Sequence, residues 1–174
     1  MMRRKRDLFS AVLAGLALLL SGCAGYKIGP IQPTFMHDVH TIAVPTFKNE
    51  TLYPRIEVLF ADSLIKQLQQ DGTFRVVSSD RADAILEGTI TKISRKSSRS
   101  VRGNVLATKE FTLSVTIDYN VTRRDPQGPI EKRSVVGSTS YFVTGDIQQD
   151  ERQALPLAAS DAAGQLVSEI SEGW

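Results

Sequence analysis

The sequence is poor in the residues that build cross-links and metal sites. Its 174 residues include one cysteine and two histidines. A single cysteine excludes an intramolecular disulfide and a cysteine-rich zinc site. The histidines, His37 and His40, are three residues apart, a spacing that sends side chains to opposite faces of an extended segment. We therefore expect neither a bound metal nor a cofactor.

Catalytic motifs are missing as well. The chain has no glycine-rich phosphate loop, no G-x-S-x-G elbow and no H-E-x-x-H helix. Acid pairs such as Asp80 and Asp83 lie in a segment of turn composition, and no histidine stands near them as a base. A hydrolase acting on cell-wall material would need an acid and base pair in a cleft. We expect a protein that is not an enzyme.

The excess of basic residues is confined to the N-terminus. The formal net charge is +2, but Arg3, Arg4, Lys5 and Arg6 supply four of the basic residues. Without these residues and Asp7, 17 basic residues stand against 18 acidic ones. A nucleic-acid-binding domain is expected to be basic overall. The composition therefore excludes nucleic acid as a partner.

The first 22 residues have the pattern of a cleaved signal peptide. The basic run precedes Leu8–Leu20, thirteen residues without a charge, too few to span a membrane that needs about 20. The following Leu20-Ser21-Gly22-Cys23 resembles a bacterial lipobox, in which Cys23 is acylated and becomes the first residue. The alternative is a buried cysteine after an ordinary signal peptide. Ala24, by similarity to lipoproteins of two-membrane bacteria, favours the periplasmic face of the outer membrane.

The mature chain divides into a lipidated start and one domain. Residues 23–38 contain Gly29, Pro30 and Pro33 and few periodic apolar positions, so we expect an extended segment. Residues 39–172 show strand and helix patterns and predict a single domain. Its class is α+β: a two-layer sandwich with a mostly antiparallel sheet of about four strands and two helices packed on it.

Individual elements follow from hydrophobic periodicity and turn residues. A first strand over 39–47 is expected to leave its sheet at Pro45, which lacks a backbone donor. A helix is expected from Pro54 to Asp71, ended by Gly72. The remaining expectations are short strands at 74–78 and 84–93, a long antiparallel hairpin over 110–143, and a helix over 148–170 that either begins at Pro156 or is kinked there.

Alternation along the hairpin predicts which side chains are buried. From Phe111 to Val121 the odd positions are apolar and the even ones polar. One face of this strand is therefore expected to be buried and the other exposed to solvent. The same reasoning applied to the other elements gives the predicted core, which comprises Ile42, Val44, Ile56, Leu59, Phe60, Leu64, Leu86, Ile90, Leu113, Val115, Ile117, Leu166 and Ile170.

Charge is unevenly distributed in the mature chain. An acid-free run from Lys92 to Lys109, rich in serine, predicts a mobile cationic loop between the strands. Its candidate ligand residues are Arg95, Lys96, Arg99 and Arg102. A second candidate site, at the other end of the hairpin, comprises Arg123, Arg124, Lys132 and Arg133. Both sites would bind phosphates or acidic loops of a partner; the alternative is a solvated loop without a ligand.

The order of motifs resembles the LptE family of lipopolysaccharide-assembly lipoproteins. The resemblance rests on the lipobox, the run Thr41–Thr51 (TIAVPTFKNET), the helix ending in Asp71-Gly72, and the strand pattern at 74–90. It implies a subunit that sits as a plug inside a large LptD-like outer-membrane β-barrel and assists insertion of lipopolysaccharide into the outer leaflet. The signature positions Pro45, Phe47 and Asn49 have a structural explanation as strand exit, core anchor and turn.

The main alternative shares the opening of the domain. CsgG-like and LpoB-like outer-membrane lipoproteins also begin with a similar strand and helix, and they act as secretion-ring subunits or activators of cell-wall synthases. Those families continue into further αβ units. The single long strand pair in this sequence favours the LptE order.

The lipobox generates the first prediction. Mass spectrometry of the N-terminal peptide of membrane-isolated protein should show acylated Cys23 and no residues 1–22. Cys23→Ser should release the domain into the periplasm, because several acyl chains together anchor a protein stably and none would remain. A free Cys23 thiol or an intact Met1 would contradict the anchor.

Overall fold

The computed structural model describes residues 33–99, 109–124, 132–143 and 145–173. The predicted signal peptide, Cys23, Arg102 and the expected turn at 125–128 lie outside these residues. The described part begins with a short 3-10 helix, η2 (Thr34–Met36), where an extended segment was expected.

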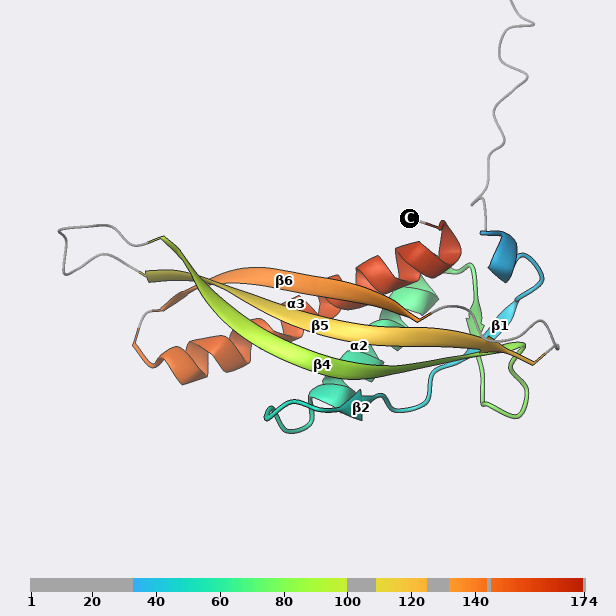
Figure 1. Cartoon of the computed structure of the whole chain (residues 1–174), viewed down its shortest axis with the longest axis horizontal. Coiled ribbons are helices and arrows are strands. Elements are labelled where there is room, and N and C mark those ends of the chain that lie inside the picture. Colours follow the sequence, from blue (N-terminus) through green and yellow to red (C-terminus); the bar gives the residue numbers. More distant parts are fainter. Residues whose placement is uncertain (1–32, 100–108, 125–131, 144, 174) are drawn as a thin grey trace, which may run out of the picture. The chain divides into compact units, whose positions relative to one another are not determined.

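Two helices cover one face of a mixed sheet (Figure 1). The strand order is β3-β1-β4-β5-β6, with β2 joined to β4 outside this path. The α+β prediction is confirmed, but a mostly antiparallel sheet of about four strands was wrong. The elements are β1 (Thr41–Ala43), β2 (Lys48–Asn49), α2 (Ile56–Asp71), β3 (Arg75–Val76), β4 (Ala84–Arg99), β5 (Lys109–Arg123), β6 (Arg133–Val143) and α3 (Ile147–Ser171).

The parallel part of the sheet comes from the start of the domain. Strand β1 pairs in parallel with both β3 and β4, and β2 pairs in parallel with β4. The connection from β1 to β3 runs through α2, as parallel neighbours require a crossover. Of the expected strand over 39–47 only β1 is strand, and β2 begins just beyond the expected end. Pro45 lies between them, which confirms that the chain leaves the sheet there.

Helix α2 is held by one apolar stripe. Ile56, Phe60, Leu64 and Leu68 recur every fourth residue and are buried, which places them on one face. Gly72 ends the helix as predicted, with a left-handed φ of 76° and its N–H bonded to the carbonyl of Leu68. The helix begins two residues after Pro54, because Arg55 also has a positive φ of 65°.

The long hairpin begins earlier than the sequence pattern indicated. Strand β4 continues through Arg99, so much of the expected loop is strand. The register of β4 and β5 shifts between Ile90 and Lys92, which leaves Thr91 as an extra residue and reverses which side chains face the helices. Before Thr91 the even positions are buried; after it the odd positions face the helices.

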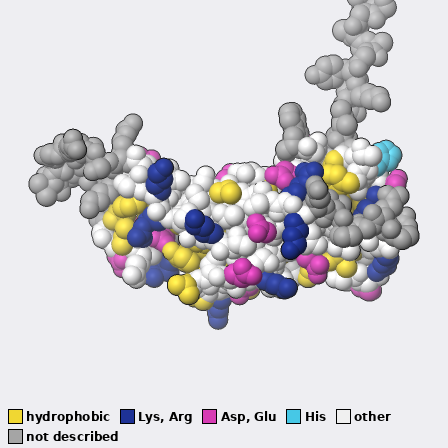
Figure 2. Space-filling view, in the orientation of Figure 1, with side chains coloured by type: hydrophobic (Ala, Val, Ile, Leu, Met, Phe, Trp, Pro, Cys, Tyr) yellow, Lys and Arg dark blue, Asp and Glu magenta, His cyan; other side chains and the backbone are white. Residues whose placement is uncertain are grey.

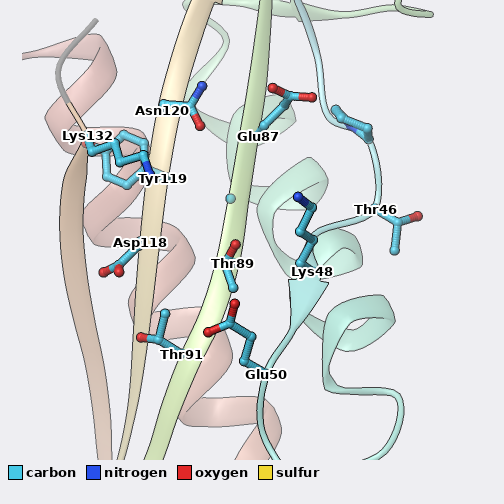
Figure 3. A pocket seen from close by; sticks show the side chains of 12 residues that line it. Thr46, Lys48, Glu50, Glu87, Thr89, Thr91, Asp118, Tyr119, Asn120 and Lys132 are labelled. Atoms are coloured by element: carbon cyan, nitrogen blue, oxygen red, sulfur yellow. The ribbon is translucent and has the colours of Figure 1, made fainter.

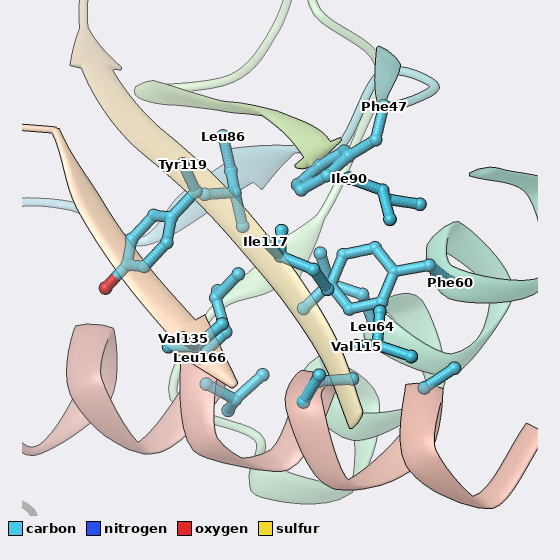
Figure 4. Close-up of a cluster of buried hydrophobic side chains, with 14 of the residues drawn as sticks. Phe47, Phe60, Leu64, Leu86, Ile90, Val115, Ile117, Tyr119, Val135 and Leu166 are labelled. Carbon is cyan, nitrogen blue, oxygen red and sulfur yellow. The ribbon is translucent and has the colours of Figure 1, made fainter. Parts of the chain in front are cut away.

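The core lies between the sheet and the two helices (Figure 4). Eleven of the thirteen predicted core residues are buried, while Val44 and Leu59 are half-buried and pack against the cluster. The odd positions of β5 are the buried ones, which confirms the predicted face. The structure adds Met36, Phe47, Phe74 and an alanine stripe on α3 to this core.

Helix α3 does not begin at Pro156, which excludes one of the two alternatives. The helix begins at Ile147, capped by the Asp146 carboxylate, and continues through Pro156. The proline ring is exposed. The backbone carbonyl four residues earlier, which loses its hydrogen-bond donor to the proline, therefore lies on the solvent-exposed side of the helix. The helix then approaches β6 closely at Gly137, where a Cβ would collide with the backbone of Ala158 and Ala162. Glycine is required at this contact.

The buried face of β5 generates a stability prediction. Ile117→Ala should lower the free energy of unfolding by about 2 to 5 kcal/mol, because Ile117 is fully buried and leaves a cavity. Thr116→Ala, on the opposite face, should change it by less than about 0.5 kcal/mol. Urea denaturation of both variants measures the difference. A larger loss for Thr116→Ala would contradict the assigned faces.

Candidate functional site

The predicted cationic residues lie at two ends of the hairpin. Strand β5 pairs with Arg99 of β4 at one end and carries Arg123 at the other. Fifteen strand residues span about 45 Å. The two groups are therefore separate, as expected from the sequence. We name the end at Arg99 and Lys109 the distal end, and the end at Arg123 and Arg133 the basal end.

Arg95 lies on strand β4 and faces the helices. Its guanidinium forms an ion pair with the buried carboxylate of Glu151 on α3. Its Cζ atom also lies 5.6 Å from the centre of the Phe111 ring, within the range of a cation–π contact. The pKa of Arg95 is raised, chiefly by the hydrogen bond to Glu151. This arginine therefore has a partner inside the chain.

Glu151 gathers further hydrogen bonds around its carboxylate. The hydroxyl groups of Tyr53 and Tyr141 both donate to it. Burial and then the bond to Glu151 raise the pKa of Tyr53 to about 12, so this hydroxyl remains a donor at neutral pH. Helix α3 is thereby connected to β4, β6 and the segment before α2. A buried carboxylate needs such partners to offset its desolvation.

The sheet face turned away from the helices is polar. Lys92 and Lys96 are exposed there and pair across with Thr116 and Thr112 of β5. Figure 2 shows positive and negative side chains interspersed on this face, with many others that are neither charged nor hydrophobic. The hydroxyl-bearing residues on it are Ser94, Ser98, Thr112, Ser114, Thr116, Ser138 and Ser140.

Lys96 remains a candidate ligand residue at the distal end. Its side chain is exposed. Arg99 is the last residue of β4, and Arg102 lies beyond the described part of the chain. Anion binding by these three residues stays a prediction.

At the basal end, two of the predicted arginines hold the start of the domain. Arg123 donates to the carbonyl of Phe35 at 3.1 Å and lies 3.7 Å from the carboxylate of Asp38. The Cζ atom of Arg133 lies 5.2 Å from the centre of the Phe35 ring. We call this set of contacts the N-terminal clamp. It fixes η2 against the base of β5 and β6.

Arg124 also has partners within the chain. Its guanidinium donates to the carbonyls of Ser79 and Asp80, at 3.1 and 2.6 Å. These contacts fasten the turn before β4. Of the basal candidates, Lys132 differs, because it lines a surface groove.

This groove lies on the polar face between the β1–β2 segment and strands β4 and β5 (Figure 3). Its volume is about 360 Å³. Lys48 and Glu50 stand on one wall, and Asp118 lies towards the other. Together with Glu87 and Lys132 the lining holds three acids and two lysines. Because acids outnumber lysines in this lining, the groove does not favour a small anion as its ligand.

The signature positions have structural roles, as the sequence suggested. The amide nitrogen of Asn49 donates to the carbonyl of Tyr53 at 2.8 Å and to the carboxylate of Glu57 at 2.9 Å. The ring of Phe47 is buried and lies against Gly88, where any Cβ would collide with it. The run from Pro45 to Asn49 therefore builds the turn into α2.

Two further observations concern residues that the structure describes. None of their helices is both long and apolar enough to cross a membrane. Within the same residues, no three His, Cys, Asp or Glu side chains gather where a metal ion could be held.

The family model LptE, described as lipopolysaccharide-assembly, matches residues 39–170, which is more than half of the chain. The match begins where the first strand was expected and ends in α3. The chain belongs to the LptE family. Membership places it in a family of non-enzymatic lipoproteins of lipopolysaccharide assembly and decides against the CsgG-like and LpoB-like alternative.

Solved structures of similar fold share little sequence with this chain. A minor lipoprotein from Acinetobacter baumannii is 14% identical, with a TM-score of 0.50 over 77% of this chain and 94% of that one. A Xanthomonas campestris protein is 11% identical, with a TM-score of 0.52 over 77% and 85%. Rare lipoprotein B from Shewanella oneidensis reaches only 0.40, at 13% identity over 74% and 89%. No curated protein sequence gives a significant match.

In this LptE-family chain, sequence reasoning missed the role of Glu151. The residue belongs to an acidic helix and has no motif around it. Its partner Arg95 is 56 positions away, inside a segment that looked like a loop. Only the combination of a buried helix position with an acidic residue could have drawn attention to it.

The Glu151 network generates the third prediction. Glu151→Gln should lower the free energy of unfolding by about 2 to 3 kcal/mol, because it removes the charge that pairs with Arg95 inside the fold. Thermal and urea unfolding measure this loss. Glu50→Gln, at an exposed position, is the matched control. Equal stability of the two variants would show that the ion pair contributes nothing.

Proposed function

We propose that this protein is the plug subunit of an outer-membrane β-barrel translocon and assists insertion of lipopolysaccharide into the outer leaflet. The proposal rests on membership of the LptE family. In this proposal Cys23 carries the lipid anchor, the domain lies on the periplasmic face of the outer membrane, and an LptD-like barrel is the protein partner.

The N-terminal clamp fixes the point at which the anchor is joined to the domain. Nine residues lie between Cys23 and Pro33, and a fully extended chain over these ten steps spans at most about 35 Å. Since Arg123 and Arg133 hold η2, the tether from the acylated cysteine joins the domain at its basal end.

Of the two ends, the distal end is the better candidate for binding an anionic ligand. Lys96, Arg99 and Arg102 carry three positive charges without an acid between Lys92 and Lys109. Arginine binds phosphate through a bidentate fork, and lipid A and core sugars carry phosphates. Arg95 is not included, because its guanidinium pairs with Glu151. Arg123, Arg124 and Arg133 likewise bind groups within the domain.

Isolation of the complex tests the plug role. The lipidated chain, carrying an affinity tag and solubilised from membranes of its native host, should bring down one barrel protein of about 80 kDa or more. A cell-wall synthase, or a ring of identical subunits, in place of the barrel would contradict the proposal.

Charge reversal at the distal end tests the ligand. A variant with Lys96→Glu, Arg99→Glu and Arg102→Glu should unfold at the wild-type temperature yet bind lipopolysaccharide at least tenfold more weakly, and salt should weaken wild-type binding. Three reversals at exposed cations elsewhere, Lys66→Glu, Arg75→Glu and Arg152→Glu, form the matched control. Equal affinity in the two triple variants would leave the distal end without a ligand.

A further inference from the structure

Strand β6 forms one edge of the sheet, and part of its backbone faces outward. Within the described sheet β6 pairs only with β5. The Ser138 N–H donates to the Asp161 carboxylate of α3 at 2.8 Å, so it points away from β5. Backbone groups alternate along an antiparallel strand. The N–H and C=O groups of Ser140 and Phe142 therefore also point outward.

These outward groups have no backbone partner among the described residues. At Ser138 the Asp161 side chain occupies the edge, whereas Ser140 and Phe142 are exposed. An exposed row of backbone donors and acceptors is a template for another strand. The edge is thus blocked by a side chain at Ser138 and accessible to another strand at Ser140 and Phe142.

A pocket adjoins the open part of this edge. Its volume is about 260 Å³, and it lies between β6 and the first half of α3. Phe142 and Leu157 line it and are 57% and 60% exposed, although most large apolar side chains of the described domain are buried. Ala154 and Tyr141 complete its apolar lining. Asp150 and Gln153 supply its polar lining, and an apolar side chain in this pocket would contact Phe142 and Leu157.

We infer that the edge at Ser140–Phe142 and this pocket bind an extended segment of the barrel partner, with one apolar side chain in the pocket. The inference rests on the proposed function. An extended segment satisfies both features, because its backbone pairs with the outward groups while its side chains reach the pocket. A helix or an acyl chain would cover the edge and leave its donors and acceptors without partners.

The geometry favours a different protein over a second copy of this chain. In two copies meeting through β6, Asp161 would block the edge at Ser138 on each side. Only a few residues of each copy would then remain in contact. The area that they bury would be far below the roughly 800 Å² per partner of a stable interface. An outer-membrane barrel supplies extended segments in its long loops. Such a segment can use a short edge, because other contacts hold the complex together.

Two substitutions test the docking site in the full-length lipidated protein. Leu157→Asp places a charge at the pocket. Ser140→Pro removes one outward N–H and leaves the bonds to β5 in place, since proline is tolerated where a donor faces outward. Each tagged variant is isolated from solubilised membranes of the native host, and the amount of barrel per tagged chain is measured. We expect at least a tenfold loss of barrel in both variants, with unchanged thermal unfolding.

Matched substitutions control for a general effect of the changes. Leu52→Asp alters a leucine that is 99% exposed in the segment before α2. Ser134→Pro alters an outward position at the other end of β6. Both controls should retain the barrel at the wild-type level. Loss of barrel in the controls as well would show that the effect is not specific to the pocket.

The remaining outcomes separate this inference from the proposed function. If wild-type protein brings down no barrel, the proposed function fails and the docking site loses its partner. If Leu157→Asp and Ser140→Pro keep the barrel, the docking site is overturned while the function stands. If purified wild-type protein forms dimers that Ser140→Pro abolishes, the occupant is a second copy and the assignment to the barrel is wrong.

Discussion

The buried carboxylate of Glu151 is the interaction on which the arrangement of this domain depends. It accepts hydrogen bonds from Arg95 on β4, Tyr141 on β6 and Tyr53 before α2. The buried stripe of α3 is otherwise mostly apolar, with five alanines among its members. A charge with partners on three sides fixes the helix at one position. The tight contact of Gly137 with α3 lies further along the same helix, at Ala158 and Ala162 in its middle.

The cations that suggested ligand sites divide into two kinds once the contacts are known. Arg95, Arg123, Arg124 and Arg133 all bind carboxylates, carbonyls or a ring inside the domain. Lys92 and Lys96 face solvent instead. In a chain with nearly equal numbers of acids and bases, an arginine flanked by serines is therefore weak evidence for a ligand. Partners that are distant in the sequence decide its role, such as Glu151 for Arg95 and the carbonyl of Phe35 for Arg123.

How far the sequence could predict the fold depended on element length. The alternation from Phe111 to Val121 spans eleven residues, and its buried face was assigned correctly. Strands β1 and β3 have three and two residues, too few to show a period, so the parallel part of the sheet was missed. The end of β4 was read as a loop because serine, lysine and arginine have no strand pattern there. Pairing with β5 supplies the order that side-chain type does not.

The extra residue at Thr91 has a consequence for how this hairpin can change in evolution. It switches the inward positions of β4 from even to odd, so Arg95 faces Glu151 and Lys96 faces solvent. Beyond this point, insertions or deletions of two residues preserve both faces. A single inserted residue between Thr91 and Arg95 would turn the arginine outward and leave the buried acid without its cation. Length variation between Thr91 and Arg95 in related proteins should therefore occur in steps of two.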